Sequence, residues 1–468
     1  MKAVQWQRPA RRRTELGMIA LVLLLTGGLY TLASLGSAGA LPAHIVPFLG
    51  LVLALMLVAH LSLRRFAPQA DPVLLPLAAL LNGFGYVFIA GLDGAEASAQ
   101  ATWTAIAVAC FVAVLVLFPR AANFERYRYT IALGGLALLL LPLVPHIGED
   151  INGARLWVHI GPLNFQPEEF AKVALAIFFA SVLAERAELL ATGTRRIGRW
   201  LVLEPRYLAP LLAAWSVSLL VLLAENDLGS SFLFFTLFVS LLWVATGKWA
   251  YLALGAVLFT VGAVFALDVI HHAQTRVQAW LDPWAHFATS GYQIIEGWFA
   301  LAAGGMWGLG PGQGNPQIIP EASTDFIFAS IGEEVGLVGL TALLITYLLM
   351  MGSGLRVAVR SQRSFTKLLA TGLSLLMGVQ VFVVVGGITR VIPITGITLP
   401  FVSYGGSSLV SNYILLAILL RISNDNANDQ AMSEAAALEA GAEAARAAAA
   451  ARTGGAAPTA RPTEAVTL

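Results

Sequence analysis

Asp325 stands where a polar segment, residues 320–324, enters a long apolar run that begins at Phe326. A carboxylate at such a boundary ordinarily caps the helix that follows, and the residues alone favour this structural role. The alternative is a carboxylate at the mouth of an outward cavity, where burial raises its pKa far enough for general-base chemistry. The sequence leaves both roles open.

Glu169 and Lys172 form a second candidate site. They follow Pro167 at a spacing of i,i+3, which places both side chains on one face of a helix whose first turn suits the proline and the acid. Lys172 already lies inside an apolar segment, where an ammonium group is costly without a partner. The pair is therefore either purely structural or part of a functional cavity.

Other polar segments carry weaker signals. Residues 225–230 are explained by a short loop that caps the next helix, although a functional role there is also open. Residues 390–408 contain prolines and repeated small residues, and such irregular backbone at membrane depth must be buried in protein or line a cavity. The glycine-rich stretch 304–314 lacks the spacing of a phosphate loop. No His, Cys and carboxylate cluster has metal-ligand spacing.

The elements that position these groups must be membrane-spanning helices. The chain has 468 residues, of which 58% are hydrophobic and 12% charged, with a mean hydropathy of +0.76. Soluble domains carry roughly 25% charged residues, so this chain could not cover a water-facing surface. The net charge of +1 indicates no nucleic-acid partner, and the single cysteine, Cys110, cannot form an internal disulfide.

Apolar runs predict an all-α, polytopic transmembrane bundle of about twelve spans. The expected spans are 17–36, 45–63, 73–91, 103–118, 130–146, 168–184, 208–224, 229–246, 250–268, 325–351, 369–389 and 404–421. With the N-terminus inside, about 24 of the 28 basic residues fall on the cytoplasmic side, which fixes the direction of the spans and places both termini in the cytoplasm. The two long connections, 147–167 and 269–324, are then extracytoplasmic. Four basic residues remain on or near the outer side: Arg155, Lys172, Arg276 and Arg390.

Three regions are expected along the chain. Residues 1–68 comprise a cytoplasmic N-terminus and two spans, 69–423 form the main membrane unit, and 424–468 form a disordered cytoplasmic tail because they contain almost no large apolar residue. The basic residues before the first apolar run also resemble a signal peptide. A retained signal anchor is favoured because the run is long and a second span follows closely.

Five segments together strongly resemble the SEDS family, which comprises the RodA, FtsW and SpoVE proteins of bacterial shape, division and sporulation. The resemblance covers about residues 73–421 in the expected order and is closest to actinobacterial RodA-type members. The segments are Gln166–Lys172, Asp227–Ser230, Leu281–Pro283 with Gly291–Gln293, Pro320–Phe328 and Pro400–Ser408.

The resemblance implies a peptidoglycan glycosyltransferase that polymerises lipid II outside the cytoplasmic membrane and works with a class B penicillin-binding protein. It implies a ten-span core, so that the first two spans are an addition. By the family pattern the essential carboxylate is Asp325, and the family's Glu and Lys are Glu169 and Lys172. The chain departs from the pattern at Leu156, at residues 225–226 and at Arg390, which leaves individual contacts open.

In that reaction a sugar hydroxyl displaces undecaprenyl pyrophosphate at an anomeric carbon. One base suits a single inverting displacement, because a pyrophosphate leaves without a paired acid if cations or a metal ion meet it. We expect Asp325 to be the base, directly or through a bound Mg²⁺ or Mn²⁺. The four outer cations are the candidates for substrate contact, with Glu169 beside Lys172. A lipid II flippase and a non-catalytic scaffold for the penicillin-binding protein are the alternatives.

Overall fold

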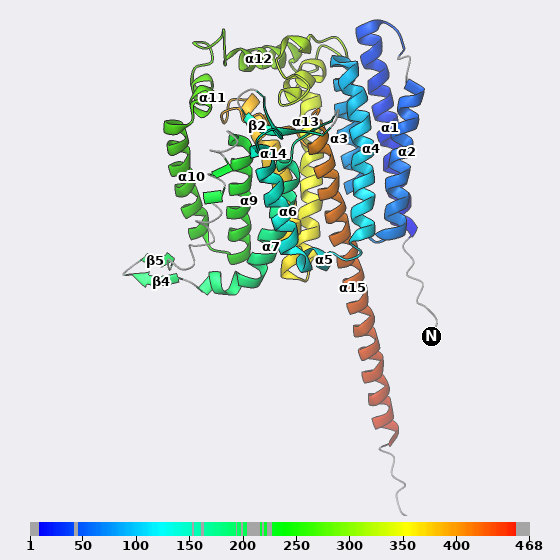
Figure 1. The fold of residues 1–468 in the computed structure, drawn as a ribbon. Coiled ribbons are helices and arrows are strands. Elements are labelled where there is room, and N and C mark those ends of the chain that lie inside the picture. The colour runs from blue at the N-terminus through cyan, green and yellow to red at the C-terminus, as the bar shows by residue number, and fades with distance from the viewer. Residues whose placement is uncertain are drawn as a thin grey trace, which may run out of the picture.

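The computed structural model describes residues 9–41, 45–151, 154–160, 163–192, 194–197, 200–203, 216–217, 220–221 and 227–454. Long helices run side by side, and short helices and loops cover one end of the bundle (Figure 1). The helices are α1 (Pro9–Ala38), α2 (Ile45–Phe66), α3 (Leu74–Leu92), α4 (Gly94–Leu117), α5 (Ala122–Arg126), α6 (Arg128–Leu140), α7 (Glu168–Thr192), α9 (Leu228–Thr246), α10 (Trp249–Val269), α11 (His271–Leu281), α12 (Tyr292–Gly304), α13 (Ile327–Arg360), α14 (Ser364–Ile388) and α15 (Gly406–Gly454).

The polytopic helical fold is confirmed, but the count of twelve spans is not. In the described part of the chain, nine helices are long and apolar enough to cross a membrane: α1, α2, α3, α4, α9, α10, α13, α14 and α15. The expected span 130–146 is a shorter apolar helix that ends in the 3-10 turn η1 (Leu141–Leu143). The span expected at 168–184 is α7, whose acidic and basic residues lower its hydropathy, and that at 208–224 falls largely outside the described residues.

α14 and α15 form the centre of the bundle. In the most apolar stretch of each helix, 72% of the residues are buried in α14 and 83% in α15. In α10, which lies at the periphery, only 17% are buried. A helix that is apolar on all sides is buried in protein or faces lipid, and these burial values separate the two cases. The central helices therefore provide the fixed frame for polar groups that enter the bundle.

The expected outer loop 147–167 contains a small antiparallel sheet. The strands are β1 (Gly148–Ile151), β2 (Ala154–Ile160) and β3 (Leu163–Phe165), with β2 in the middle. Val158 of β2 pairs with Gly148 on one side and with Phe165 on the other. A separate hairpin joins β4 (Thr194–Ile197) to β5 (Trp200–Leu203). The sequence Asn-Gly at 152–153 is a strong hairpin signal and could have predicted the pairing of β1 with β2.

The tail differs from the prediction of disorder after residue 423, because α15 continues to Gly454 (Figure 1). Three consecutive polar residues of α15 hold neighbouring elements. Asn424 accepts a hydrogen bond from the Gln69 amide, Asp425 accepts one from the Ala121 amide at 2.7 Å, and Asn426 donates to the Val357 carbonyl at 2.9 Å. Beyond them, alanine and glutamate favour the helix even though they bury little.

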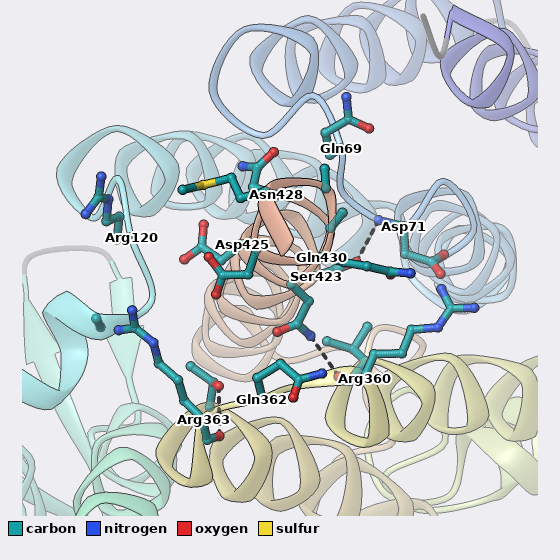
Figure 2. A pocket seen from close by; sticks show the side chains of 18 of the residues that line it. Gln69, Asp71, Arg120, Arg360, Gln362, Arg363, Ser423, Asp425, Asn428 and Gln430 are labelled. Carbon is teal, nitrogen blue, oxygen red and sulfur yellow. Dashed lines mark hydrogen bonds between the residues drawn. The ribbon is translucent and has the colours of Figure 1, made fainter. Parts of the chain in front are cut away.

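The two ends of the bundle differ in character. One end carries α11 and α12 (Figure 1). Asp325 lies at the same end, because Gln293 of α12 donates a hydrogen bond to it, and we call this end the Asp325 end. At the other end a polar cavity of about 620 Å³ opens beside α15 (Figure 2). α13 begins next to Asp325, and Arg356 and Arg360 at its other end line this cavity, so that the cavity and Asp325 lie at opposite ends of α13. Four arginines that the positive-inside rule assigned to the cytoplasm line it: Arg120, Arg356, Arg360 and Arg363.

Candidate active site

Asp325 lies in a turn immediately before α13 and is partly buried. It does not cap the helix, because the N-cap residue is Phe326 and no side chain accepts a cap hydrogen bond there. Its Oδ1 instead accepts hydrogen bonds from the Thr324 hydroxyl at 3.3 Å and the Gln293 amide at 3.5 Å. The capping role is therefore wrong, and the carboxylate is available for chemistry.

The surroundings of Asp325 raise its pKa from the ordinary value of 3.8 to about 7. Burial is the largest cause, because it disfavours the charged carboxylate, and the nearby Glu321 carboxylate adds to the increase. Arg276 acts in the opposite direction by stabilising the charged form. A pKa near neutrality suits a general base at physiological pH.

Arg276, on α11, interacts electrostatically with two carboxylates. Its Nη1 donates to the Ile394 carbonyl at 3.2 Å, and both Asp227 and Asp325 stabilise its charge. Burial lowers the pKa of Arg276, which shows that this charge has been partly withdrawn from water. Of the three predicted outer cations whose side chains the structure describes, Arg276 is the one whose charge acts on Asp325.

Asp227 is the cap that the sequence predicted. Its carboxylate accepts hydrogen bonds from the amides of Gly229 at 2.8 Å and Ser230 at 3.1 Å, at the start of α9. The first turn of α9 approaches the connection between α14 and α15, since a Cβ on Gly229 would lie 2.4 Å from the Ile397 side chain. The cap thus also presents a negative charge to Arg276.

The irregular segment between α14 and α15 positions the Asp325 turn. The Ser403 hydroxyl donates to the Thr324 carbonyl at 2.5 Å and accepts from the Leu399 amide at 2.7 Å. The Tyr404 amide donates to the Ser323 carbonyl at 2.8 Å. The predicted irregular backbone is confirmed, but it is buried only in part: residues 399–403 are buried, whereas Val391 and Gly396 are exposed. The buried part fixes the residues before Asp325.

Glu169 and Lys172 form the predicted ion pair and are both buried. The Lys172 ammonium also donates to Gln380 on α14 at 3.0 Å, and the Ser411 hydroxyl donates to Glu169 at 3.0 Å. Gln380 in turn donates to the Thr398 carbonyl at 2.8 Å. The pair therefore supports the same segment that holds the Asp325 turn, although its own groups are engaged with each other.

Arg390 connects α11 to the end of α14. Its guanidinium donates to the carbonyls of Trp280, at 2.9 Å, and Leu281, at 2.5 Å, and lies 5.6 Å from the centre of the Trp298 ring. The Arg390 guanidinium, which was predicted to contact substrate, is thus engaged within the protein. Its contact with substrate stays a prediction. Arg155 lies on β2, and its side chain is outside the described residues.

A divalent cation finds at most a partial set of protein ligands. Among the described residues, no three His, Cys, Asp or Glu side chains are grouped as a metal site. Asp325 and Glu321 both contact the Thr324 hydroxyl, so that two carboxylates face one region. Mg²⁺ is commonly held by one or two carboxylates together with substrate phosphates, and this pair fits that pattern.

Two residues of the site, Gln380 and Glu321, were not predicted from the sequence. Gln380 is an amide inside an apolar span, a position where polar residues tend to be functional, and that signal was available. Glu321 precedes Asp325 by four residues, but only the turn, with its positive φ at Glu321, brings both carboxylates to one hydroxyl.

Comparisons with known proteins identify the family to which this chain belongs. The family described as cell cycle protein, FtsW/RodA/SpoVE, matches residues 73–428. The peptidoglycan glycosyltransferase RodA of Mycobacterium tuberculosis is 42% identical over 427 residues, which cover 89% of this chain and 91% of the relative. A probable peptidoglycan glycosyltransferase FtsW of Geobacter metallireducens is 32% identical over 370 residues, or 75% and 94% of the two chains.

Solved structures show the same fold. A chain from a peptidoglycan synthase complex, described as coordinating polymerization and crosslinking, aligns with a TM-score of 0.63 and 27% identity over 76% of this chain and 98% of its own. The rod shape determining protein RodA of Thermus thermophilus aligns with a TM-score of 0.55 and 28% identity over 76% and 97%. The chain therefore belongs to the FtsW/RodA/SpoVE family, and it is a multi-pass membrane protein.

Proposed function

We propose that this chain is a peptidoglycan glycosyltransferase that polymerises lipid II into glycan strands at the outer face of the cytoplasmic membrane. The observation that carries the proposal is a partly buried carboxylate, Asp325, with a pKa of about 7, beside the cation Arg276. The relatives at 42% identity are named peptidoglycan glycosyltransferases, which supports the same activity. RodA-type relatives favour a role in cell shape over one in division.

Asp325 removes the proton of the attacking sugar hydroxyl as the new glycosidic bond forms and the bond to the pyrophosphate breaks. The proton ends on the carboxylate, and the configuration at the anomeric carbon inverts in this one displacement. Gln293 and Thr324 hold the carboxylate in place through their hydrogen bonds to it. The nearby negative charge of Glu321 raises the pKa of Asp325 and so makes it a stronger base.

Arg276 meets the negative charge that develops on the departing pyrophosphate. A guanidinium offers several donors in a fixed plane, which suits phosphate oxygens better than an ammonium does. Lys172 is engaged with Glu169 and Gln380, so its part is to support the site. Mg²⁺ or Mn²⁺ held by Asp325 and Glu321 would add neutralising charge at the phosphates.

The orientation of the chain follows from its arginines. The cavity end, with Arg120 and Arg360, faces the cytoplasm, and the Asp325 end faces outward. Both termini are cytoplasmic. The related peptidoglycan synthase complex supports a class B penicillin-binding protein as the partner, which crosslinks the strands that this chain makes.

The test is polymerisation of lipid II by the purified protein with its partner, comparing the wild type with Asp325→Asn. The substitution keeps the size of the side chain but removes the base, and glycan formation should be lost. Full activity of the variant would overturn the assignment of the base. Transfer of lipid II across vesicles without any glycan product would identify a flippase, and an inactive wild type that activates its partner would identify a scaffold.

A further inference from the structure

The additional helix α1 contacts the loop that leads to Asp325. We call residues 305–315 the glycine-rich loop. The Gln313 side-chain amide donates to the Gly36 carbonyl near the outer end of α1. A Cβ on Gly36 would lie 2.1 Å from the Pro311 carbonyl oxygen, and one on Gly312 would lie 2.1 Å from the Ala33 carbonyl oxygen. The two backbones therefore touch, and neither position has space for a side chain.

The other side of the glycine-rich loop is bound to the first turns of α13. Two buried glutamates of α13 accept hydrogen bonds from its backbone: Glu334 from the Gly312 amide at 2.7 Å and Glu333 from the Asn315 amide at 3.1 Å. These bonds are made by carboxylates inside the protein, where leaving them unpaired would be costly. A displacement of the loop at Gly312 would therefore stretch or break its hydrogen bond to Glu334.

The backbone of α13 is also opened to receive this loop. Gly336 has φ 63°, which interrupts the helix and frees amides and carbonyls on both sides of it. Leu309 donates to the freed Glu333 carbonyl at 2.9 Å, and the Leu337 amide donates to the Gly305 carbonyl at 2.9 Å. The glycine-rich loop thus makes hydrogen bonds to α13 on both sides of the interruption, including one to the segment 327–335 that precedes it.

Asp325 precedes that segment by two residues. We propose that α1 positions Asp325 for the reaction by clamping the glycine-rich loop against the first segment of α13. Gly36, Gly312 and Gln313 are then positioning residues that act through Glu333 and Glu334. This inference rests on the proposed glycosyltransferase function, and it assigns the added N-terminal helices a task in that reaction.

The test is Gly36→Ala in the full-length protein, with Gly28→Ala as the matched control. Both substitutions add one methyl group to α1, but a Cβ on Gly28 meets no atom within 4 Å. A shift of the loop by about 1 Å should lower kcat roughly 10- to 100-fold in folded Gly36→Ala, with KM for lipid II unchanged. The unfolding temperature should also fall, because the added methyl group overlaps the Pro311 carbonyl. Gly28→Ala should match the wild type. Equal kcat values for both variants would overturn the inference and leave the proposed function intact.

Hydrogen–deuterium exchange gives a readout that does not depend on activity. Amides of residues 309–315 should exchange faster in Gly36→Ala than in Gly28→Ala, and unchanged exchange would overturn the clamp even if the wild type makes no glycan. An inactive wild type with the expected exchange would instead refute the proposed function. If Gly36→Ala fails to fold, Gly312→Ala is compared with Gly305→Ala, because both have positive φ but only Gly312 meets backbone.

Discussion

The raised pKa of Asp325 predicts how the polymerisation rate depends on pH. If Asp325 is the base, the rate follows the deprotonated fraction of a group with a pKa of about 7. At pH 5 about 1% of the carboxylate is deprotonated, and at pH 8 about 90%, so the rate should rise roughly 90-fold between them. A carboxylate at the ordinary value of 3.8 would give nearly equal rates at both pH values.

Two substitutions should move this midpoint in opposite directions. Glu321→Gln removes a negative charge that raises the pKa of Asp325, so the midpoint should fall. Arg276→Gln removes a positive charge that lowers the same pKa, so the midpoint should rise, and the plateau rate should fall with the loss of a phosphate contact. Glu439→Gln is the control, because Glu439 is exposed on the far part of α15.

The assay is the initial rate of glycan formation from fluorescent lipid II, measured with saturating partner from pH 5 to pH 8. Thermal unfolding at each pH separates titration of the base from loss of folded protein. A flat wild-type profile would refute Asp325 as the titrating base. Movement of both midpoints in the same direction would refute the electrostatic account, since the two charges have opposite signs.

Other predictions concern stability and the cation. Because the folded pKa of Asp325 lies above its unfolded value, its contribution to stability falls between about pH 4 and pH 7, so Asp325→Asn should raise the unfolding temperature at pH 8 while abolishing polymerisation. Lys172→Met leaves Glu169 buried without its cation and should cost about 3–5 kcal/mol in denaturant unfolding, most of which the double variant with Glu169→Gln should recover. Arg390→Lys should lower the unfolding temperature and change the fluorescence of Trp298, because an ammonium cannot reproduce the forked contact. EDTA should slow polymerisation, and Mg²⁺ or Mn²⁺ should restore it; an unchanged rate would contradict a bound cation.

The sequence predicts the spans of this protein better than its site geometry. Long apolar runs reveal α3 or α14 directly, because a span must satisfy its backbone within itself. The partner of Lys172 on α14 lies 208 residues away, and no local pattern indicates that contact. Asp325 was identified as a candidate, but its role depended on which residue caps α13, a matter of backbone geometry. The division of the chain into three regions stays a prediction.

The uninterrupted course of α15 has a mechanical consequence. Near one end of this 49-residue helix, Ser411 contacts Glu169 in the network that supports the site. A helix of this length measures about 74 Å, so a tilt of about 5° around the site would displace its far end by about 6 Å. A protein bound to the far end of this helix could therefore move Ser411, and with it the Glu169–Lys172 pair that supports the site.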